Sequence, residues 1–425
     1  ATWLFARWPD SSSQSSRNHV ALTPLKDQIM IKLRVTALLL ACALSPLAFA
    51  DNWQPITGAD ALRDMISGAV VEVELKAGVM SIATYSADGT AVVKAWGETF
   101  QRTWEIVGDD QVCYTDIETK CFTLERNPDD PGALRATDVE SGEVFMARVS
   151  GSAGAEFIEE AASAGSEGAL GEPSAAEIAA ALSDPNTTMG SLNFNLDYVA
   201  YKGDFPGAGS ADAWRMLFQP VLPYSLSDTT NFFVRPAIPV ILSQDVPQAG
   251  GGFSSEGVDL GDIGFDVAVG KTLPGGIVVL GGVVGTLPTA TDDALGLDQW
   301  LLGPEVAIAK VAKWGVVGVL LTHQWDIAGD DDFDTSITGG QYSYVFNLKN
   351  GWQISSSPTF SYNHEASSGN KWTLPVGIGV SKTSIISGRP WKFSAQYWQY
   401  VKTPDNFGPD FQLRFTVTPV VSLPW

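Results

Sequence analysis

Hydrophobic and polar residues alternate along the last stretch of the chain, Phe411 to Trp425. Every second residue from Phe411 onward is apolar or aromatic, and the residues between them are mostly polar. A period of two residues predicts a β-strand that separates an apolar medium from a polar one. A strand that closes a membrane barrel needs such an outer face and leaves no edge unpaired. The alternative is the edge strand of a soluble sandwich, where so apolar a strand would favour aggregation.

The same pattern recurs from Ser191 onward and predicts an antiparallel barrel of about twelve strands over residues 189–425. The expected spans are 191–201, 212–224, 231–242, 259–270, 276–287, 299–311, 315–327, 337–348, 352–363, 372–383, 390–401 and 411–424. Short turns and longer polar loops alternate between them, as in outer-membrane barrels. Tryptophans near the strand ends predict the aromatic girdles of a bilayer: Trp214, Trp300, Trp325, Trp352, Trp372, Trp391 and Trp425.

Residues 51–152 predict a small antiparallel β domain in front of the barrel. Its strand-like runs are Val70–Leu75, Val79–Tyr85, Ala91–Trp96, Arg102–Val107, Val112–Tyr114, Cys121–Glu125 and Val144–Val149. Thr57 with Asp60 predicts a capping-box start for a short helix that runs through Ile66. Asp88-Gly89 predicts a tight hairpin turn between two of the strands.

Residues 153–188 differ from both neighbours because Ala, Gly, Ser and Glu dominate them. Two short helices are candidates here, Phe157–Ala164 and Ala175–Leu182, and Ser174 with Glu177 would cap the second. Two interpretations stay open. The segment is either a solvated linker or a helix that lies at or inside the barrel mouth as a plug.

Residues 30–50 have the organisation of a secretory signal peptide. Lys32 and Arg34 form the basic start, 35–44 the apolar centre, and Ala48-Phe49-Ala50 the cleavage site. Residues 1–29 are then upstream sequence that is not translated. An alternative is a lipoprotein signal, because Leu39-Leu40-Ala41-Cys42 resembles a lipoprotein box.

Beyond the signal the chain keeps two cysteines, Cys113 and Cys121. An even number of cysteines close in sequence, in an exported protein, predicts a local disulfide. Their spacing does not suggest a metal site, and no cofactor motif is present. No run of ~18 apolar residues follows the signal, so no transmembrane helix is expected.

The composition supports a membrane β protein. Charged residues make up 17% of the chain, below the roughly 25% usual for soluble proteins. Aromatic residues make up 10%, with 14 Trp among them. A net charge of −22 argues against nucleic acid as a partner.

Several short sequence motifs within residues 187–425 occur in the order seen in a known protein family. They are Phe218-Gln219-Pro220-Val221-Leu222-Pro223, Arg235-Pro236-Ala237-Ile238-Pro239, Gly261-Asp262-Ile263-Gly264, Leu287-Pro288-Thr289-Ala290-Thr291-Asp292-Asp293, Ala328-Gly329-Asp330-Asp331-Asp332 and Phe407-Gly408-Pro409-Asp410. This region resembles the bacterial outer-membrane transporter family named for the MetA pathway of phenol degradation, members of which are sometimes mislabelled neuromedin U. The resemblance implies a β-barrel with a role in uptake of aromatic or other hydrophobic compounds.

The alternation along the strands places several charged and aromatic side chains inside the barrel. For basic residues this placement is also required by energy, because a basic side chain that faces lipid near the midplane costs ~2–4 kcal/mol. The lumen and selectivity candidates are Arg215, Arg235, Asp262, Asp266, Glu305, Asp326, Lys392, Trp398, Tyr400 and Arg414. They either tie strands together as structural salt bridges or line a constriction that sets selectivity. Trp398 and Tyr400 would stack an aromatic solute or pack against a plug.

These patterns predict an all-β outer-membrane channel or transporter whose N-terminal domain lies in the periplasm. Its expected work is passive or facilitated uptake of small, aromatic or hydrophobic solutes. The expected partners are outer-membrane lipid and lipopolysaccharide, the barrel assembly machinery through the C-terminal strand, and the solute. One alternative is an outer-membrane anchor that displays a periplasmic binding domain. A second is an outer-membrane lipase in which Ser361 or Ser367 lies near His364, although no G-x-S-x-G motif is present.

Overall fold

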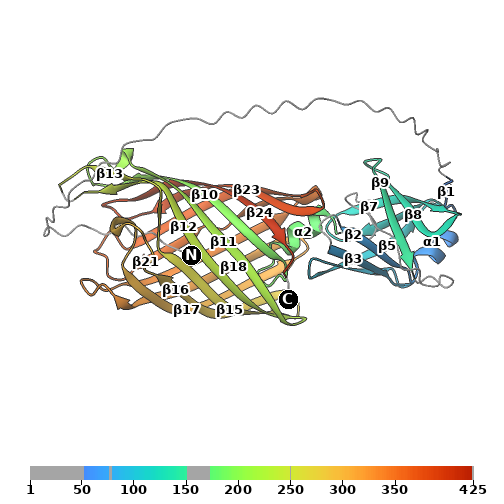
Figure 1. Ribbon diagram of the computed structural model, residues 1–425, viewed down its shortest axis with the longest axis horizontal. Coiled ribbons are helices and arrows are strands. Elements are labelled where there is room, and N and C mark those ends of the chain that lie inside the picture. Colours follow the sequence, from blue (N-terminus) through green and yellow to red (C-terminus); the bar gives the residue numbers. More distant parts are fainter. Residues whose placement is uncertain (1–51, 76–78, 151–172, 249, 424–425) are drawn as a thin grey trace, which may run out of the picture.

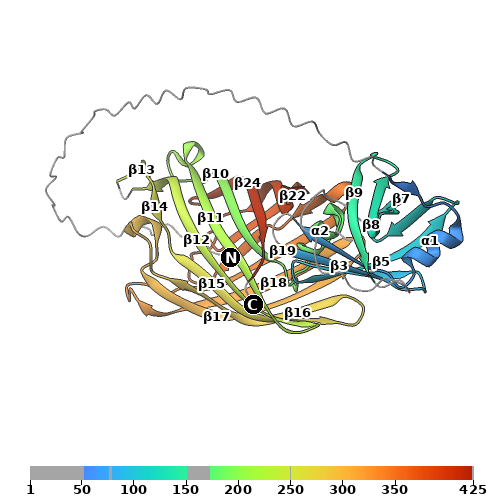
Figure 2. The same cartoon turned by 45° about the vertical axis from the view of Figure 1, so that its right-hand side comes forward.

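Two β-barrels lie end to end in the computed structural model, with helix α2 (Ala175–Ala181) between them (Figure 1). The structure describes residues 52–75, 79–150, 173–248 and 250–423. The predicted signal, the upstream segment and the candidate helix Phe157–Ala164 lie outside these residues. The view of Figure 2 also places α2 at the junction of the two barrels.

The smaller barrel has eight strands, each paired antiparallel with the next. They are β2 (Val70–Leu75), β3 (Val79–Tyr85), β4 (Thr90–Ala95), β5 (Glu98–Val107), β6 (Gln111–Thr115), β7 (Thr119–Asn127), β8 (Asp130–Asp138) and β9 (Val144–Ser150). The β2–β9 pairing closes the ring, and a short strand β1 (Gln54–Pro55) adds to β7. Aromatic side chains such as Tyr85, Trp104 and Phe122 fill the interior, so this barrel is a packed core.

Helix α1 (Ala59–Ile66) covers the end of the small barrel that lies farther from α2 (Figure 1). Its Leu62 and Ile66 are fully buried in the small-barrel core. The helix ends at Ile66 as predicted, but the capping box at Thr57 and Asp60 was wrong. Gly58 takes the N-cap position with a φ of 100° and no side-chain cap forms, because the helix starts one residue later than the box requires.

The larger barrel is closed and has twelve antiparallel strands, which confirms the predicted all-β fold class and strand number. In chain order they are β10 (Gly190–Lys202), β11 (Asp212–Ser227), β12 (Thr230–Pro247), β15 (Ile263–Leu273), β16 (Ile277–Leu287), β17 (Gln299–Ala312), β18 (Gly315–Gly329), β19 (Ser336–Asn347), a divided strand of β20 (Trp352–Ser356) and β21 (Thr359–Asn363), β22 (Trp372–Ile386), β23 (Arg389–Lys402) and β24 (Gly408–Val421). The β10–β24 pairing joins the first strand to the last.

Short elements lie between these strands. Strands β13 (Phe253–Glu256) and β14 (Asp259–Leu260) pair antiparallel with the C-terminal half of β12. The 3₁₀ turns are η1 (Ala208–Ser210), η2 (Asp293–Leu295) and η3 (Lys349–Gly351). Loops at the barrel end farther from the small barrel include η1 and η2, whereas η3 belongs to a turn beside α2. We call these the loop end and the small-barrel end.

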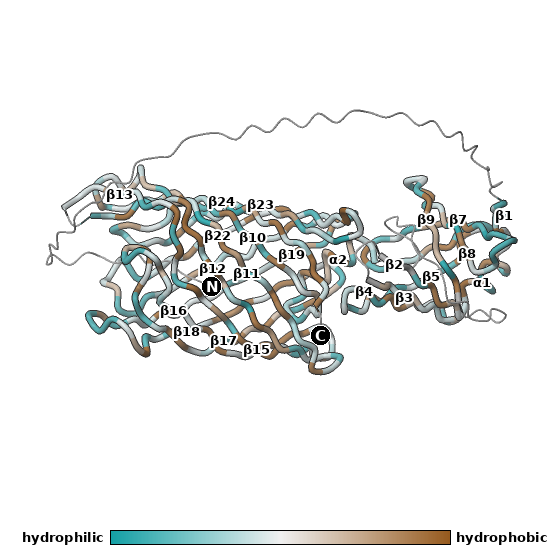
Figure 3. Tube along the Cα trace, in the orientation of Figure 1, coloured by the Kyte–Doolittle hydropathy of each residue, from teal (hydrophilic) through white to brown (hydrophobic). Residues whose placement is uncertain are grey.

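The barrel wall has opposite polarity on its two faces. Outward side chains on successive strands are apolar and exposed: Val269, Val283, Val306, Ile308, Leu321, Val376, Ile378 and Phe415. Inward positions carry buried polar groups: Asp197, Asp266, Glu305, Gln353, Thr383 and Gln412. Hydrophobic residues recur along the strands of both barrels (Figure 3). A water-soluble barrel would show the reverse arrangement, with the apolar face inside.

Candidate functional site

The first charge cluster lies on three neighbouring strands of the large barrel. Asp197 on β10 stands directly opposite Arg414 on β24 and Arg215 on β11 in the strand register. Arg414 donates two hydrogen bonds of 2.7 Å to the two carboxylate oxygens of Asp197. Arg215 approaches the same carboxylate only to 3.9 Å, and 21% of its side chain is exposed. Two guanidinium groups therefore share one carboxylate, and the cluster has a formal charge of +1.

The predicted aromatic candidates belong to the same cluster. The guanidinium carbon of Arg414 lies 4.6 Å from the ring centroid of Trp398, and Trp398 Nε1 donates to Gln396 at 3.0 Å. The Tyr400 hydroxyl donates to Gln412 at 3.0 Å. Only 1% of Trp398 and 4% of Tyr400 is exposed. Both rings therefore pack against barrel side chains, and Arg414 already covers one face of Trp398.

The second charge cluster joins Arg235 on β12, Asp266 on β15 and Glu305 on β17. Arg235 lies directly opposite Asp266 in the register and contacts it at 2.6 Å. It reaches past β16 to Glu305 at 3.0 Å. Gly282 is the β16 residue opposite Glu305, and a Cβ atom there would lie 2.4 Å from the Val267 carbonyl oxygen and 2.6 Å from the Ala268 side chain of β15. One guanidinium shares two carboxylates, so this cluster has a formal charge of −1.

The remaining charged candidates lie apart from both clusters. Asp262 accepts backbone hydrogen bonds from Thr289, Ala290 and Leu297, and it therefore holds a loop at the loop end. Asp326 likewise accepts from the Thr335 backbone at 2.6 Å. Lys392 donates to the Ser183 hydroxyl at 3.2 Å, next to α2.

The interior of the large barrel is narrow. Inward side chains from different parts of the wall are almost inaccessible to water, with exposed fractions of 1% for Asp197, 2% for Glu305, and 0% for Gln353 and Thr383. A wide aqueous pore of the kind found in barrels of 16–18 strands would leave such side chains exposed. Salt bridges and polar side chains occupy the space instead.

The ladder of the wall is interrupted between β20–β21 and β22. The predicted strand 352–363 divides at Ser357 and Pro358, and residues 355–360 have no ladder pairing with β22. Pro358 has no backbone N–H to donate, which explains the interruption. Tyrosine hydroxyls of β19 donate across the break, Tyr342 to the Pro375 carbonyl at 3.1 Å and Tyr344 to the Gly377 carbonyl at 2.7 Å.

On the interior side of the same break, Gln396 accepts hydrogen bonds from polar groups that have no ladder partner there. Its side-chain oxygen accepts hydrogen bonds of 3.0 Å from the Ser356 hydroxyl, the Ser357 backbone and Trp398. A Cβ atom at Gly377 would lie 2.5 Å from Pro358 and 2.7 Å from Trp398. Glycine is therefore required where these two side chains meet the wall.

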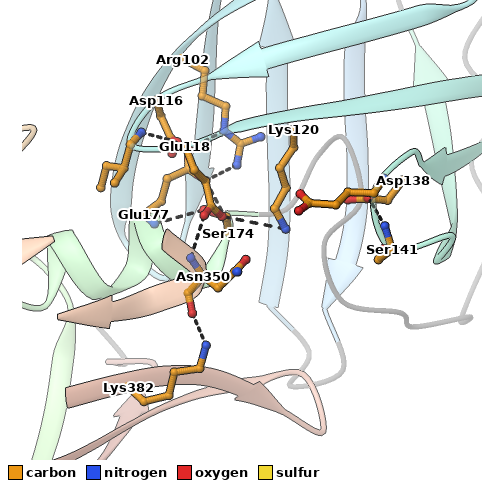
Figure 4. Close-up of polar contacts among 12 residues, drawn as sticks. Arg102, Asp116, Glu118, Lys120, Asp138, Ser141, Ser174, Glu177, Asn350 and Lys382 are labelled. Atoms are coloured by element: carbon orange, nitrogen blue, oxygen red, sulfur yellow. Dashed lines mark hydrogen bonds and ion pairs between the residues drawn. The ribbon is translucent and has the colours of Figure 1, made fainter. Parts of the chain in front are cut away.

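A third charged cluster lies outside the large barrel, where α2 meets the small one (Figure 4). Arg102 of β5 and Glu177 of α2 form a bidentate, fully buried ion pair. Glu177 also completes a capping box with Ser174, as predicted from the sequence. Burial opposes ionisation of Glu177, but the Arg102 guanidinium outweighs it and lowers the pKa of that carboxyl. Burial, reinforced by Glu177, raises the pKa of Asp116 to about 7.

The cysteine pairing is as expected. Cys113 and Cys121 form a disulfide across the β6–β7 hairpin, where the two residues are opposite each other in the register. No cluster of three or more metal-ligating side chains occurs in the part of the chain that the structure describes.

His323 and His364 lie on the outer wall near the loop end. The Thr338 hydroxyl is 2.9 Å from His364 Nε2 and 2.8 Å from His323 Nδ1. The hydroxyl bonded to His364 is therefore that of Thr338, and neither Ser361 nor Ser367 holds this position in the described structure. The residues that a serine lipase needs are not brought together here.

The fold and its interior define a class: a closed twelve-stranded barrel with an apolar exterior, a narrow polar interior and a second barrel at one mouth. No family model matches the sequence. No curated protein matches it either. No helix among residues 52–75, 79–150, 173–248 and 250–423 is long and apolar enough to cross a membrane.

The comparison with solved structures found the following three proteins among its matches. An outer membrane channel from Pseudomonas putida F1 is 13% identical with a TM-score of 0.44, over 55% of this chain and 94% of that one. CdiB from Acinetobacter baumannii is 8% identical with a TM-score of 0.27, over 83% and 59%. A mutant Rh. blastica porin is 11% identical with a TM-score of 0.22, over 55% and 99%. Similarity at this level assigns no solute or mechanism to this chain, and the resemblance to the family named for phenol degradation stays a prediction.

Proposed function

We propose that this protein is an outer-membrane channel for passive or facilitated uptake of small solutes, aromatic or hydrophobic ones among them. The observation that carries this proposal is the polarity of the large barrel. Exposed apolar side chains cover successive strands from outside, and charged clusters lie within. Soluble monomers rarely expose apolar surface of this extent, whereas a barrel in a bilayer requires it.

The orientation follows from the ends of the barrel. Turns at the small-barrel end are short, for example residues 228–229 and 387–388, whereas the loop end carries longer segments such as residues 288–298. Outer-membrane barrels have short periplasmic turns and longer extracellular loops. The small barrel accordingly lies in the periplasm. Exposed tryptophans at strand ends, Trp214 and Trp300 among them, then mark the membrane boundaries.

The two interior clusters are successive charged positions along the lumen. Arg215 pairs with Ile241 of β12, and Arg235 lies six residues closer to the small barrel on that strand. At ~3.3 Å per residue, the two arginines are ~20 Å apart along the wall. A solute from outside meets the cationic cluster first. Arg215 lies farther from the Asp197 carboxylate than Arg414 does, and its side chain is partly exposed. Arg215 is therefore the group that attracts an anionic solute.

Aromatic side chains gather at the loop end, which suits an aromatic solute. Phe205, Phe253, Phe407 and Tyr201 form a continuous set of ring contacts, with centroid separations of 4.6 to 5.4 Å. They come from three different loops or strand ends. Such rings offer an apolar surface for a solute that leaves water.

Planar-bilayer recordings of the purified protein test both the channel and the role of Arg215. Under a salt gradient, we expect Arg215→Gln to shift the reversal potential toward cation preference, and Arg215→Glu to shift it further. Lys202→Gln is the matched control, because it removes one exposed positive charge that pairs with Asp410. Equal shifts in Arg215→Gln and Lys202→Gln would show that Arg215 has no special part in selectivity.

The narrow interior favours one alternative, an outer-membrane anchor that displays the small barrel to a periplasmic partner. Bilayer conductance and solute uptake separate the two functions. The channel predicts measurable conductance and slower uptake of an aromatic solute in a deletion strain. No conductance combined with unchanged uptake would favour the anchor.

A further inference from the structure

Residues 173–189, which we call the strap, include α2 and lead into the first strand of the large barrel. On one side the strap is bound to β20. Gln353 Nε2 donates to the Ala179 carbonyl at 2.9 Å and to the Ser183 hydroxyl at 3.1 Å. Helix α2 also contacts β19, β22, β23 and η3 of the same part of the wall.

Asn186 attaches the strap to a different part of the wall. Its side-chain amide donates to the Thr229 carbonyl at 3.1 Å and to the Thr272 hydroxyl at 2.8 Å. The Asn231 side chain donates to the Asn186 carbonyl at 2.7 Å. These partners belong to β12, to β15 and to the turn before β12.

The two attachments lie on opposite sides of the barrel. Going round the ring from β12 to β20, one path passes β11, β10, β24, β23 and β22, and the other passes β15, β16, β17, β18 and β19. The strap therefore crosses the barrel along a diameter at its small-barrel end.

The attachments are to the inner surface of the wall. Gln353 is completely buried and Asn231 is 3% exposed, both at inward positions of their strands. A Cβ at Gly270 would lie 2.7 Å from Asn186 Oδ1. A side chain at that inward position of β15 would collide with the strap, which therefore occupies the mouth itself.

The opposite face of the strap belongs to the small barrel. Ile178 and Met189 are fully buried in the small-barrel core. Glu177 forms the buried pair with Arg102, and the Glu98 carboxylate accepts from the Thr188 backbone and the Thr187 hydroxyl. The bonds to the wall are mostly neutral hydrogen bonds. Separation of the buried charged pair would leave a buried charge without its partner, which costs more than the loss of a neutral hydrogen bond.

We propose that the strap is the gate of the channel, and that the small barrel holds and moves it as one body. The proposal rests on the proposed channel function. In the closed state the strap crosses the mouth, as observed. Opening breaks the neutral bonds of Gln353 and Asn186 to the wall and keeps the strap in the small-barrel core. The small barrel thus acquires a function of its own, which is to close the periplasmic exit.

Variants that weaken the wall attachments test the gate in the full-length protein. Asn186→Ala and Gln353→Ala are expected to raise the open probability in planar bilayers several-fold. Thr416→Ala is the matched control, because it removes a 2.8 Å hydrogen bond to Asn195 between two wall strands without touching the strap. Heat-modifiable gel mobility shows that each variant retains a folded barrel.

A cross-link tests the same proposal in the other direction. Ser183→Cys with Gln353→Cys places thiols on the strap and the wall, where the native side chains form a 3.1 Å hydrogen bond. Cys113 and Cys121 are oxidised and do not compete for a bismaleimide reagent. We expect the cross-linked protein to lose conductance, whereas the single-cysteine variants with the same reagent keep it.

The outcomes separate the gate from the channel. If the wild-type protein, both alanine variants and the cross-linked protein conduct equally, the strap is not a gate, and the channel function stands. If neither the wild type nor the alanine variants conduct any ion, and the deletion strain takes up solute normally, the proposed channel function is wrong. The gate proposal is then wrong as well, because it rests on that function.

Discussion

At the scale of single residues, Asp116 is a buried carboxyl with an unusual proton affinity. Burial, reinforced by Glu177, raises its pKa to about 7, whereas an unfolded aspartate has a pKa of ~3.9. The folded protein therefore keeps this proton at a pH where the unfolded chain has lost it. The resulting stability is complete below pH ~4 and decreases up to pH ~7, by ~1.4 kcal/mol per pH unit for one proton.

Replacement Asp116→Asn should remove this pH dependence. The neighbouring charges do not change over the range, because the pKa of Glu177 is lowered, that of Arg102 is raised, and Tyr85 titrates only near a pKa of about 12. We expect the small barrel of Asp116→Asn to gain stability over wild type at pH 8 and to match it more closely at pH 4. Hydrogen exchange of β5 and β6 in the full-length protein measures this, with the exposed Asp129→Asn as control. Parallel pH profiles would contradict it.

Individual interior residues were only partly predictable from sequence. Alternation of apolar and polar positions places Arg215, Arg235 and Glu305 on inward faces, but the choice of partners depends on the register between strands. Asp197 was not among the predicted lumen residues, although it lies at an inward position between Leu196 and Tyr198. Its role is visible only when β10 pairs with β24, more than 200 residues away, at the Arg414 contact.

At the scale of elements, the break between β20–β21 and β22 replaces ladder hydrogen bonds with hydrogen bonds from side chains. Phenylalanine at Tyr342 and Tyr344 would leave the Pro375 and Gly377 carbonyls without these donors. A buried acceptor left unpaired costs ~1–3 kcal/mol, and lipid supplies no replacement donor. We therefore expect Tyr342→Phe with Tyr344→Phe to lower the temperature at which the barrel loses its heat-modifiable gel mobility.

The control for this prediction is Tyr397→Phe. The Tyr397 hydroxyl bonds to the side chain of Gln399 and not to a carbonyl of the wall. Equal unfolding temperatures for the double variant and this control would mean that the hydroxyls do not stabilise the break.

The spans of the large-barrel strands were predictable because lipid outside and polar groups inside impose a strict two-residue period. Two of the departures from expectation have a visible cause in the sequence. The predicted strand 352–363 is divided, and Pro358 was the available signal. Strand β8 (Asp130–Asp138) was not predicted, because Pro131 and Gly132 at its start are residues typical of turns. The small barrel cannot close without this strand.

The role of the strap could be predicted only in part. The capping box of Ser174 and Glu177 identifies helix α2 from sequence alone, and a plug at the barrel mouth was one of two interpretations. The partner of Glu177 was not predictable, because Arg102 is 75 residues away in a different barrel. Long-range pairs of this kind depend on the assembled fold and have no local signature.

At the scale of the whole molecule, the mutual orientation of the two barrels depends on few direct polar contacts besides the buried Arg102–Glu177 pair. The Glu118 carboxylate accepts from the Asn350 backbone at 2.7 Å, across the junction (Figure 4). Glu98 accepts from the strap, at Thr187 and Thr188. Because each barrel is closed on itself, loss of these contacts should free the orientation without unfolding either one.

We therefore expect Glu98→Ala with Glu118→Ala to broaden the distribution of distances between the barrels. Spin labels at Asp129→Cys and Lys313→Cys, on exposed turns of the two barrels, report this distance by pulsed electron paramagnetic resonance. Arg135→Ala removes a 2.6 Å ion pair within the small barrel and serves as control. If the barrels move as rigid bodies about the start of β10, the variant broadens and the control does not. An unchanged distribution would mean that the buried contacts of the strap alone fix the orientation.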